Sequence, residues 1–139
     1  MQTKNIMIVG VGGQGSLLAS KLLGRLLVDE GYDVKVSEVH GMSQRGGSVV
    51  TYVRYGDKVY SPIIEDGEAD FIVSFEKIEA ARWLSCLKKD GKIIVNTQQI
   101  DPMPVIIGKA QYPVDALDKI KEEGAFVDYS IIMPGAVIK

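Results

Sequence analysis

A cluster of glycines near the N-terminus is the first pattern in the sequence that could bind a ligand. Gly10, Gly12 and Gly15 fit the pattern G-x-G-x-x-G, and Gly13 and Gln14 complete the segment. In such a loop the glycines permit a tight turn, the approach of a ligand to the backbone, and close packing of a helix on a strand. The N–H groups that begin the following helix suit a phosphate or a carboxylate. The segment could therefore bind an anion or a nucleotide, contact another protein, or only solve the packing of a turn.

A second unusual segment, His-Gly-Met-Ser-Gln-Arg-Gly-Gly, covers residues 40–47. Arg45 is always charged and its planar head fits carboxylates and phosphates. Other polar groups flank it, so the segment is either part of a ligand crevice or a solvated surface loop, in which His40 is an ordinary polar side chain. The candidate residues for an active-site loop or interface are His40, Ser43, Gln44, Arg45, Gly46 and Gly47.

Residues that could perform chemistry unaided are scarce. The chain has one histidine and one cysteine, so it offers no Ser–His–Asp set that is evident from its sequence and no cysteine framework for a cluster or disulfide. Cys86 falls on the apolar side of a predicted helix and is interpreted as an inert core residue. We therefore predict no catalytic residue and no metal ligand in this chain. Such cysteine usage is typical of the cytoplasm.

Composition excludes two classes of partner. The 16 Lys and Arg against 18 Asp and Glu give a net charge of -2, so no basic surplus exists for a nucleic-acid backbone. No apolar run approaches the ~20 residues of a membrane helix. The first five residues also lack the apolar core of a secretory signal.

The elements that must position these loops follow from hydrophobic periodicity and from turn residues. Alternating strands and helices predict an α/β fold, a single Rossmann-like domain over residues 1–139 with an open, mostly parallel sheet and helices on both faces. The first strand, the first helix and the second strand have the size of a βαβ crossover. In this fold the loops at the carboxyl ends of strands line the ligand crevice. The predicted strands are 5–10, 33–38, 48–55, 58–60, 71–75, 92–96 and 105–107, and the predicted helices are 14–30, 76–89 and 115–123.

The two loops together resemble the gamma-type subunits of 2-oxoacid:ferredoxin oxidoreductases. The form of residues 40–47 is most similar to the beta subunit of the indolepyruvate type, and Ala69–Glu76 and Gly91–Asn96 continue the likeness over nearly the whole chain. Relatives usually continue with more helix after a motif similar to residues 131–136. The resemblance therefore implies that this chain is truncated or is a short variant.

The resemblance implies a non-autonomous subunit of a complex that decarboxylates a 2-oxoacid, reduces ferredoxin and releases an acyl-CoA. Thiamine diphosphate and [4Fe-4S] clusters are then expected on a larger partner subunit, with coenzyme A as co-substrate and no cofactor held by this chain alone. The two loops are expected to face the shared active site of a hetero-oligomer. The alternatives are a free-standing dinucleotide-binding protein, in which Glu38 would contact a ribose hydroxyl, and a stand-alone regulatory module.

Overall fold

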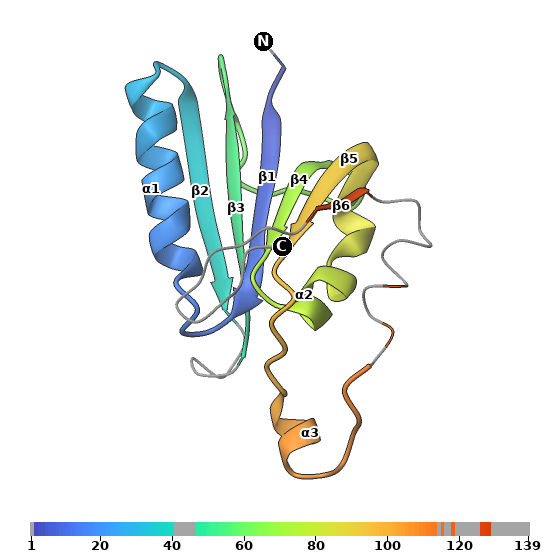
Figure 1. The fold of residues 1–139 in the computed structure, drawn as a ribbon. Helices are drawn as coiled ribbons and strands as arrows, with labels where there is room; N and C mark the ends of the chain where they lie inside the picture. Colours follow the sequence, from blue (N-terminus) through green and yellow to red (C-terminus); the bar gives the residue numbers. More distant parts are fainter. Residues whose placement is uncertain (1, 41–46, 114, 116–117, 119–125, 129–139) are drawn as a thin grey trace.

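A computed structural model describes residues 2–40, 47–113, 115, 118 and 126–128. These residues form one six-stranded sheet in the order β2-β3-β1-β4-β5-β6, flanked by helices (Figure 1). This confirms the predicted α/β fold class, because three of the five strand pairs are parallel. In chain order the elements are β1 Lys4–Val11, α1 Ser16–Asp29, β2 Asp33–His40, β3 Ser48–Gly56, β4 Ala69–Ser74, α2 Lys77–Arg82, the 3-10 turn η1 Leu84–Cys86, β5 Leu87–Val95, α3 Met103–Ile106 and β6 Phe126–Asp128.

The strand order differs from the simple crossover that the sequence suggests. β3 pairs antiparallel with both β1 and β2, so it lies between the two strands that α1 connects. The connection between β2 and β3 is too short for a parallel crossover and therefore returns as an antiparallel hairpin. The prediction of a strand over residues 58–60 is wrong, because these residues are not in a strand.

The two main helices cover opposite faces of the sheet. Gly24 of α1 lies against Val36 of β2, which is in register with Val53 of β3. The core under α2 instead contains Met7 and Tyr52, whose side chains alternate with those on the α1 side. This arrangement confirms the prediction of helices on both faces.

α1 contacts the sheet through its small residues. The buried positions of the helix are Ser16, Ser20 and Gly24, and a Cβ on Gly24 would lie 3.2 Å from Val36 Cγ2. Leu18 and Leu22 lie outside this contact and are exposed to solvent.

The segment after β4 is more irregular than predicted. The helix expected over residues 76–89 ends at Arg82, and β5 begins already at Leu87. Asp90 has a φ of 67°, and the pairing of β5 with β4 shifts register beside it, so the expected turn at Asp90 and Gly91 is an irregularity within the strand. The strand predicted at 105–107 is instead α3, a single helical turn preceded by a proline.

Cys86 is buried within the main core cluster, as its sequence position predicted. Its thiol donates a hydrogen bond to Asp66 Oδ1 at 3.3 Å. Burial and this contact with a carboxylate raise the pKa of the Cys86 thiol to about 11.

We therefore expect the Cys86 thiol to react slowly with alkylating reagents in the folded protein. At pH 8 a thiol with this pKa is ionised in only about one molecule in a thousand, and the thiolate is the nucleophile. Timed labelling followed by mass spectrometry measures the rate, with the guanidinium-unfolded protein as the control. Equal rates in the two states would contradict the buried, protonated thiol.

Candidate functional site

Both loops singled out from the sequence lead to one edge of the sheet. The carboxyl ends of β1, β2, β4 and β5 meet at this edge, where β3 begins. Val11 at the end of β1 is in register with Ser48, and Ser74 at the end of β4 is in register with Val95. The edge therefore places the glycine loop between the loop before β3 and the segments that follow β4 and β5.

The side chain of Gln14 fastens the glycine loop to this edge. Its Oε1 accepts a hydrogen bond from the Val11 N–H at 2.7 Å, and its Nε2 donates to the Phe75 carbonyl at 2.8 Å. Nε2 also lies 3.3 Å from Gln98 Oε1. Gln14 thus joins the end of β1 to the segments after β4 and β5.

The glycines of the loop serve different physical purposes. A Cβ on Gly10 would lie 2.9 Å from Gln14 Oε1 and 3.1 Å from Phe75 Cβ, so only glycine leaves room for the Gln14 bridge. Gly13 and Gly15 have φ angles of 94° and 87°, which side-chain-bearing residues rarely adopt. Gly12 donates its N–H to the Gly47 carbonyl at 2.9 Å. The five predicted residues of the glycine loop therefore belong to one ordered turn, which contacts the end of the second loop.

The second loop is described only at its ends. His40 closes β2 with its backbone paired to Val49, and Gly47 accepts the hydrogen bond from Gly12. Ser43, Gln44, Arg45 and Gly46 lie outside the described residues. The two ends confirm that the second loop leaves and re-enters the sheet at the same edge as the glycine loop.

Glu79 holds the point where the second loop joins β3. Its buried carboxylate accepts a hydrogen bond from Ser48 Oγ at 2.8 Å and from Trp83 Nε1 at 3.3 Å. Arg82, on the exposed side, lies 3.3 Å from the same carboxylate. The two loops are therefore both fastened to the corner between β4 and α2.

Glu76 is the most enclosed charged group at this edge, with no exposed surface. Its Oε1 accepts the N–H groups of Ile78 and Glu79 at 2.6 and 3.1 Å and so caps α2. Its Oε2 accepts the Ile100 N–H at 2.9 Å and the Tyr112 hydroxyl at 2.5 Å. Burial and the adjacent carboxylate raise the pKa of Tyr112 well above its usual value, so the phenol stays protonated and donates. Glu76 therefore ties together the start of α2 and two segments that follow β5.

The described side chains at this edge form no complete catalytic set. The amide of Gln14 and the carboxylates of Glu76 and Glu79 are already engaged within the protein. The first turn of α1 carries no acidic residue, and its cap residue Gly15 has no side chain, so the N–H groups of that turn leave a partial positive charge at the edge. Among the described residues, no group of three or more His, Cys, Asp and Glu side chains is placed to hold a metal ion.

The position of β2 argues against the dinucleotide alternative. In a dinucleotide-binding fold the second strand lies next to the first, and its acidic residue contacts the ribose. Here β3 lies between β1 and β2. Glu38 is on β2, so it is two inter-strand distances, or about 10 Å, away from β1. Glu38 is therefore misplaced for the ribose contact that the sequence suggested.

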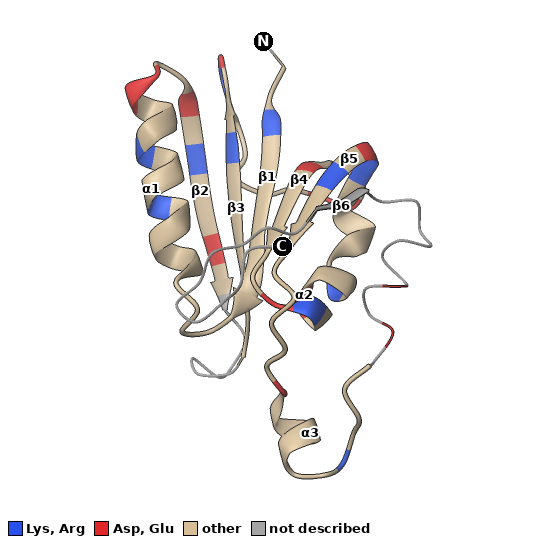
Figure 2. Cartoon of the chain, viewed as in Figure 1, with Lys and Arg blue, Asp and Glu red and all other residues tan. Residues whose placement is uncertain are grey.

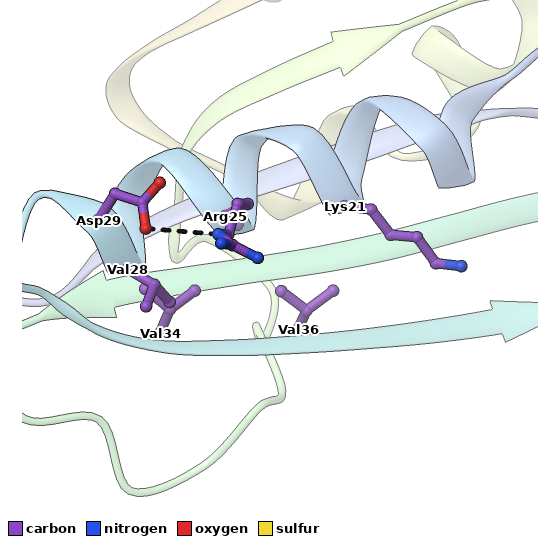
Figure 3. Close-up of a pocket in the computed structure, with 7 residues that line it drawn as sticks. Lys21, Arg25, Val28, Asp29, Val34 and Val36 are labelled. Carbon is purple, nitrogen blue, oxygen red and sulfur yellow. Dashed lines mark hydrogen bonds and ion pairs between the residues drawn. The ribbon is translucent and has the colours of Figure 1, made fainter.

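A groove lies elsewhere, between α1 and β2 (Figure 3). It has a volume of about 530 Å³, with Val28, Val34 and Val36 on its walls. At its rim Arg25 pairs with Asp29 at 3.4 Å. This open groove contains none of the predicted site residues, so it does not belong to the loop edge.

Sequence reasoning missed the residues that hold the loops in place. The sequence predicts a helix over residues 76–89 and gives no sign that both Glu76 and Glu79 are buried. The one available signal for Glu76 is its position, since an acidic residue between a buried strand and a helix is a common cap. Nothing in the local sequence marks Tyr112 or Gln98 as their partners.

Comparison with known proteins gives the family. The sequence matches the family described as pyruvate ferredoxin/flavodoxin oxidoreductase over residues 5–139. It is 51% identical over 124 residues to indolepyruvate oxidoreductase subunit IorB of Thermococcus kodakarensis and 50% identical to the protein of the same name from Pyrococcus horikoshii. Each match covers 88% of this chain but 61% of the relative, so the chain spans less than two thirds of their length.

A solved structure shares the fold. Pyruvate oxidoreductase subunit PORC of Thermotoga maritima superposes with a TM-score of 0.59 over 81% of this chain and 58% of its own, at 21% identity. In the described part of the chain no helix is long and apolar enough to cross a membrane. Together with the two loops and their common edge, these matches show that the chain belongs to the pyruvate ferredoxin/flavodoxin oxidoreductase family.

Proposed function

We propose that this chain is a non-autonomous subunit of a thiamine-dependent 2-oxoacid:ferredoxin oxidoreductase that acts on indolepyruvate or related aryl pyruvates. In this reaction the 2-oxoacid and coenzyme A give an acyl-CoA and CO₂, and the two electrons released reduce ferredoxin. The observation that supports this role most directly is the 51% identity to an indolepyruvate oxidoreductase subunit. The loop edge supports it as well, because the start of α1 gives this edge a partial positive charge that suits an anionic group.

The cofactors of the reaction are assigned to a larger partner subunit. A [4Fe-4S] cluster needs about four cysteine ligands, whereas Cys86 is the only cysteine in this sequence. Cys86 is also buried and hydrogen-bonded to Asp66. The donor set of this chain therefore does not fit a cluster. The thiamine diphosphate is likewise assigned to the partner, and the complex works in the cytoplasm as a hetero-oligomer that delivers electrons to ferredoxin.

The contribution of this chain is to shape one wall of the shared site. Residues 10–15 present the positive end of α1, and the second loop contributes His40, Ser43, Gln44, Arg45, Gly46 and Gly47. Anionic groups of coenzyme A match such a surface, because a helix start and a guanidinium both favour phosphate. In this proposal the gamma-type domain extends over residues 1–139.

Arg45→Ala tests whether the second loop reaches the shared site. We expect turnover of the reconstituted complex to fall about tenfold, because one charge-assisted contact is lost. The melting temperature of the isolated chain should stay unchanged. Lys58→Ala removes an exposed cation that follows the far end of β3, at the opposite edge of the sheet, and is the matched control. Full turnover of the Arg45 variant would contradict the placement of this loop at the active site.

A further inference from the structure

A small arm, residues 101–111, extends beyond the loop edge of the sheet. It leaves after β5, makes the single turn of α3, and returns toward Tyr112, and Figure 1 shows it standing clear of the sheet and of the other helices. The tip of the arm is apolar. Met103, Ile106 and Ile107 expose 63%, 66% and 55% of their surface. Three large apolar side chains at the end of a projection are costly to leave in water.

The arm is built to keep its shape. Within the tip, Val105 and Ile106 donate their N–H groups to the Pro102 carbonyl, and Lys109 and Ala110 donate to the Pro104 carbonyl at 2.8 and 3.1 Å. Gly108 closes the turn with a φ of 81°. A tip that is ordered by its own hydrogen bonds loses little conformational entropy when it binds.

The base of the arm is fixed by a buried charge. The carboxylate of Glu76 accepts the N–H of Ile100, where the arm departs, and the hydroxyl of Tyr112, where it returns. Lys77 donates its N–H to the Gln98 carbonyl at 3.1 Å beside this point. The same corner holds the glycine loop through Phe75. The arm is therefore rigidly placed relative to the candidate site.

We infer that the arm is a docking element whose apolar tip inserts into an apolar pocket of the larger, thiamine-containing subunit. This inference rests on the proposed function and names the contact by which the two subunits meet. The arm projects from the edge that bears the glycine loop, so a partner that closes over the loops also meets the tip. The exposed side chains of Met103, Ile106 and Ile107 are nonpolar and α3 carries no charged residue (Figure 2), which calls for an apolar pocket rather than a charged one.

A second copy of this chain is a poorer occupant. Insertion of one copy's tip into the groove of Val28, Val34 and Val36 on the next copy is a head-to-tail contact. Such contacts give rings or open filaments rather than a compact dimer. Contact between two tips buries only a few side chains from each copy, well below the area of a stable interface.

The test compares Met103→Ser/Ile106→Ser with Ile63→Ser. Ile63 exposes 55% of its surface and lies between β3 and β4, which makes it a control of similar exposure outside the arm. Melting of the isolated chains checks that both variants fold as the unmodified chain does. Calorimetric titration with the purified larger subunit measures affinity. We expect the arm variant to bind at least about tenfold more weakly and the control to bind normally, because buried apolar anchors carry much of the affinity of interfaces.

The outcomes separate this inference from the proposed function. Unchanged affinity of the arm variant would overturn the docking role of the arm and leave the proposed subunit function standing. Loss of a homodimer on size exclusion, rather than of the mixed complex, would assign the tip to a second copy and overturn the inference. Failure of the unmodified chain to bind the larger subunit at all would overturn both.

Discussion

Replacing Glu76 with alanine is expected to destabilise the fold by about 3–5 kcal/mol, the largest effect on stability that we predict for one side chain. The change removes a fully buried acceptor of four hydrogen bonds. The N–H groups of Ile78 and Ile100 and the hydroxyl of Tyr112 would then be left without this acceptor. For a domain of this size, the loss corresponds to a decrease in melting temperature on the order of 10–20 °C.

Two matched variants make the Glu76 experiment specific. Tyr112→Phe removes one of the four donors and is expected to cost about 1–2 kcal/mol. Glu65→Ala changes an exposed carboxylate and is expected to stay within about 0.5 kcal/mol of the unmodified chain. Urea unfolding followed by circular dichroism gives all three free energies. A loss below about 1 kcal/mol for Glu76→Ala would show that this carboxylate does not hold the corner together.

Gln14→Leu is expected to have the largest effect on activity, a decrease in turnover of the reconstituted complex of about 10–100-fold. Leucine has a similar size but cannot bridge the Val11 N–H and the Phe75 carbonyl. The glycine loop then loses its fixed position relative to the segments after β4 and β5. Small displacements of a binding loop reduce rates strongly, because the reacting groups must be held in one geometry.

The control for this experiment is Gln99→Leu. Gln99 is an exposed glutamine that follows β5 at the same edge of the sheet as Gln14. Its side chain contacts Lys77 and Asp101 rather than the glycine loop. Steady-state turnover is measured on purified complexes at a temperature where every variant is folded. Normal turnover of Gln14→Leu would mean that the loop is only a connector.

The sequence predicts the parts of this fold that depend on local pattern. The run Asn5–Gly10 is apolar and ends at glycines, which is enough to identify a buried strand and a tight turn. Both loops fall at strand ends, and the fold class then requires that they meet at one edge. The hydrogen bond from the Gly12 N–H to the Gly47 carbonyl confirms that expectation.

The remaining features depend on contacts between distant segments. Whether β3 lies inside or outside the β1–β2 pair is a matter of sheet order, which alternation in residues 48–55 does not encode. The buried state of Glu76 depends on Tyr112, which lies far along the chain. α3 was predicted as a strand because Val105, Ile106 and Ile107 favour strands. In the structure, hydrogen bonds to the Pro102 carbonyl close a helical turn here instead.

The central claim is that this chain shapes an active site whose reactive groups come from another subunit. The most direct measurement is the reduction of ferredoxin by an aryl pyruvate and coenzyme A, assayed with this chain alone, with the larger subunit alone, and with both together. The account predicts turnover only in the mixture. Oxidation of the 2-oxoacid by this chain alone, or full turnover of the larger subunit without it, would contradict the account.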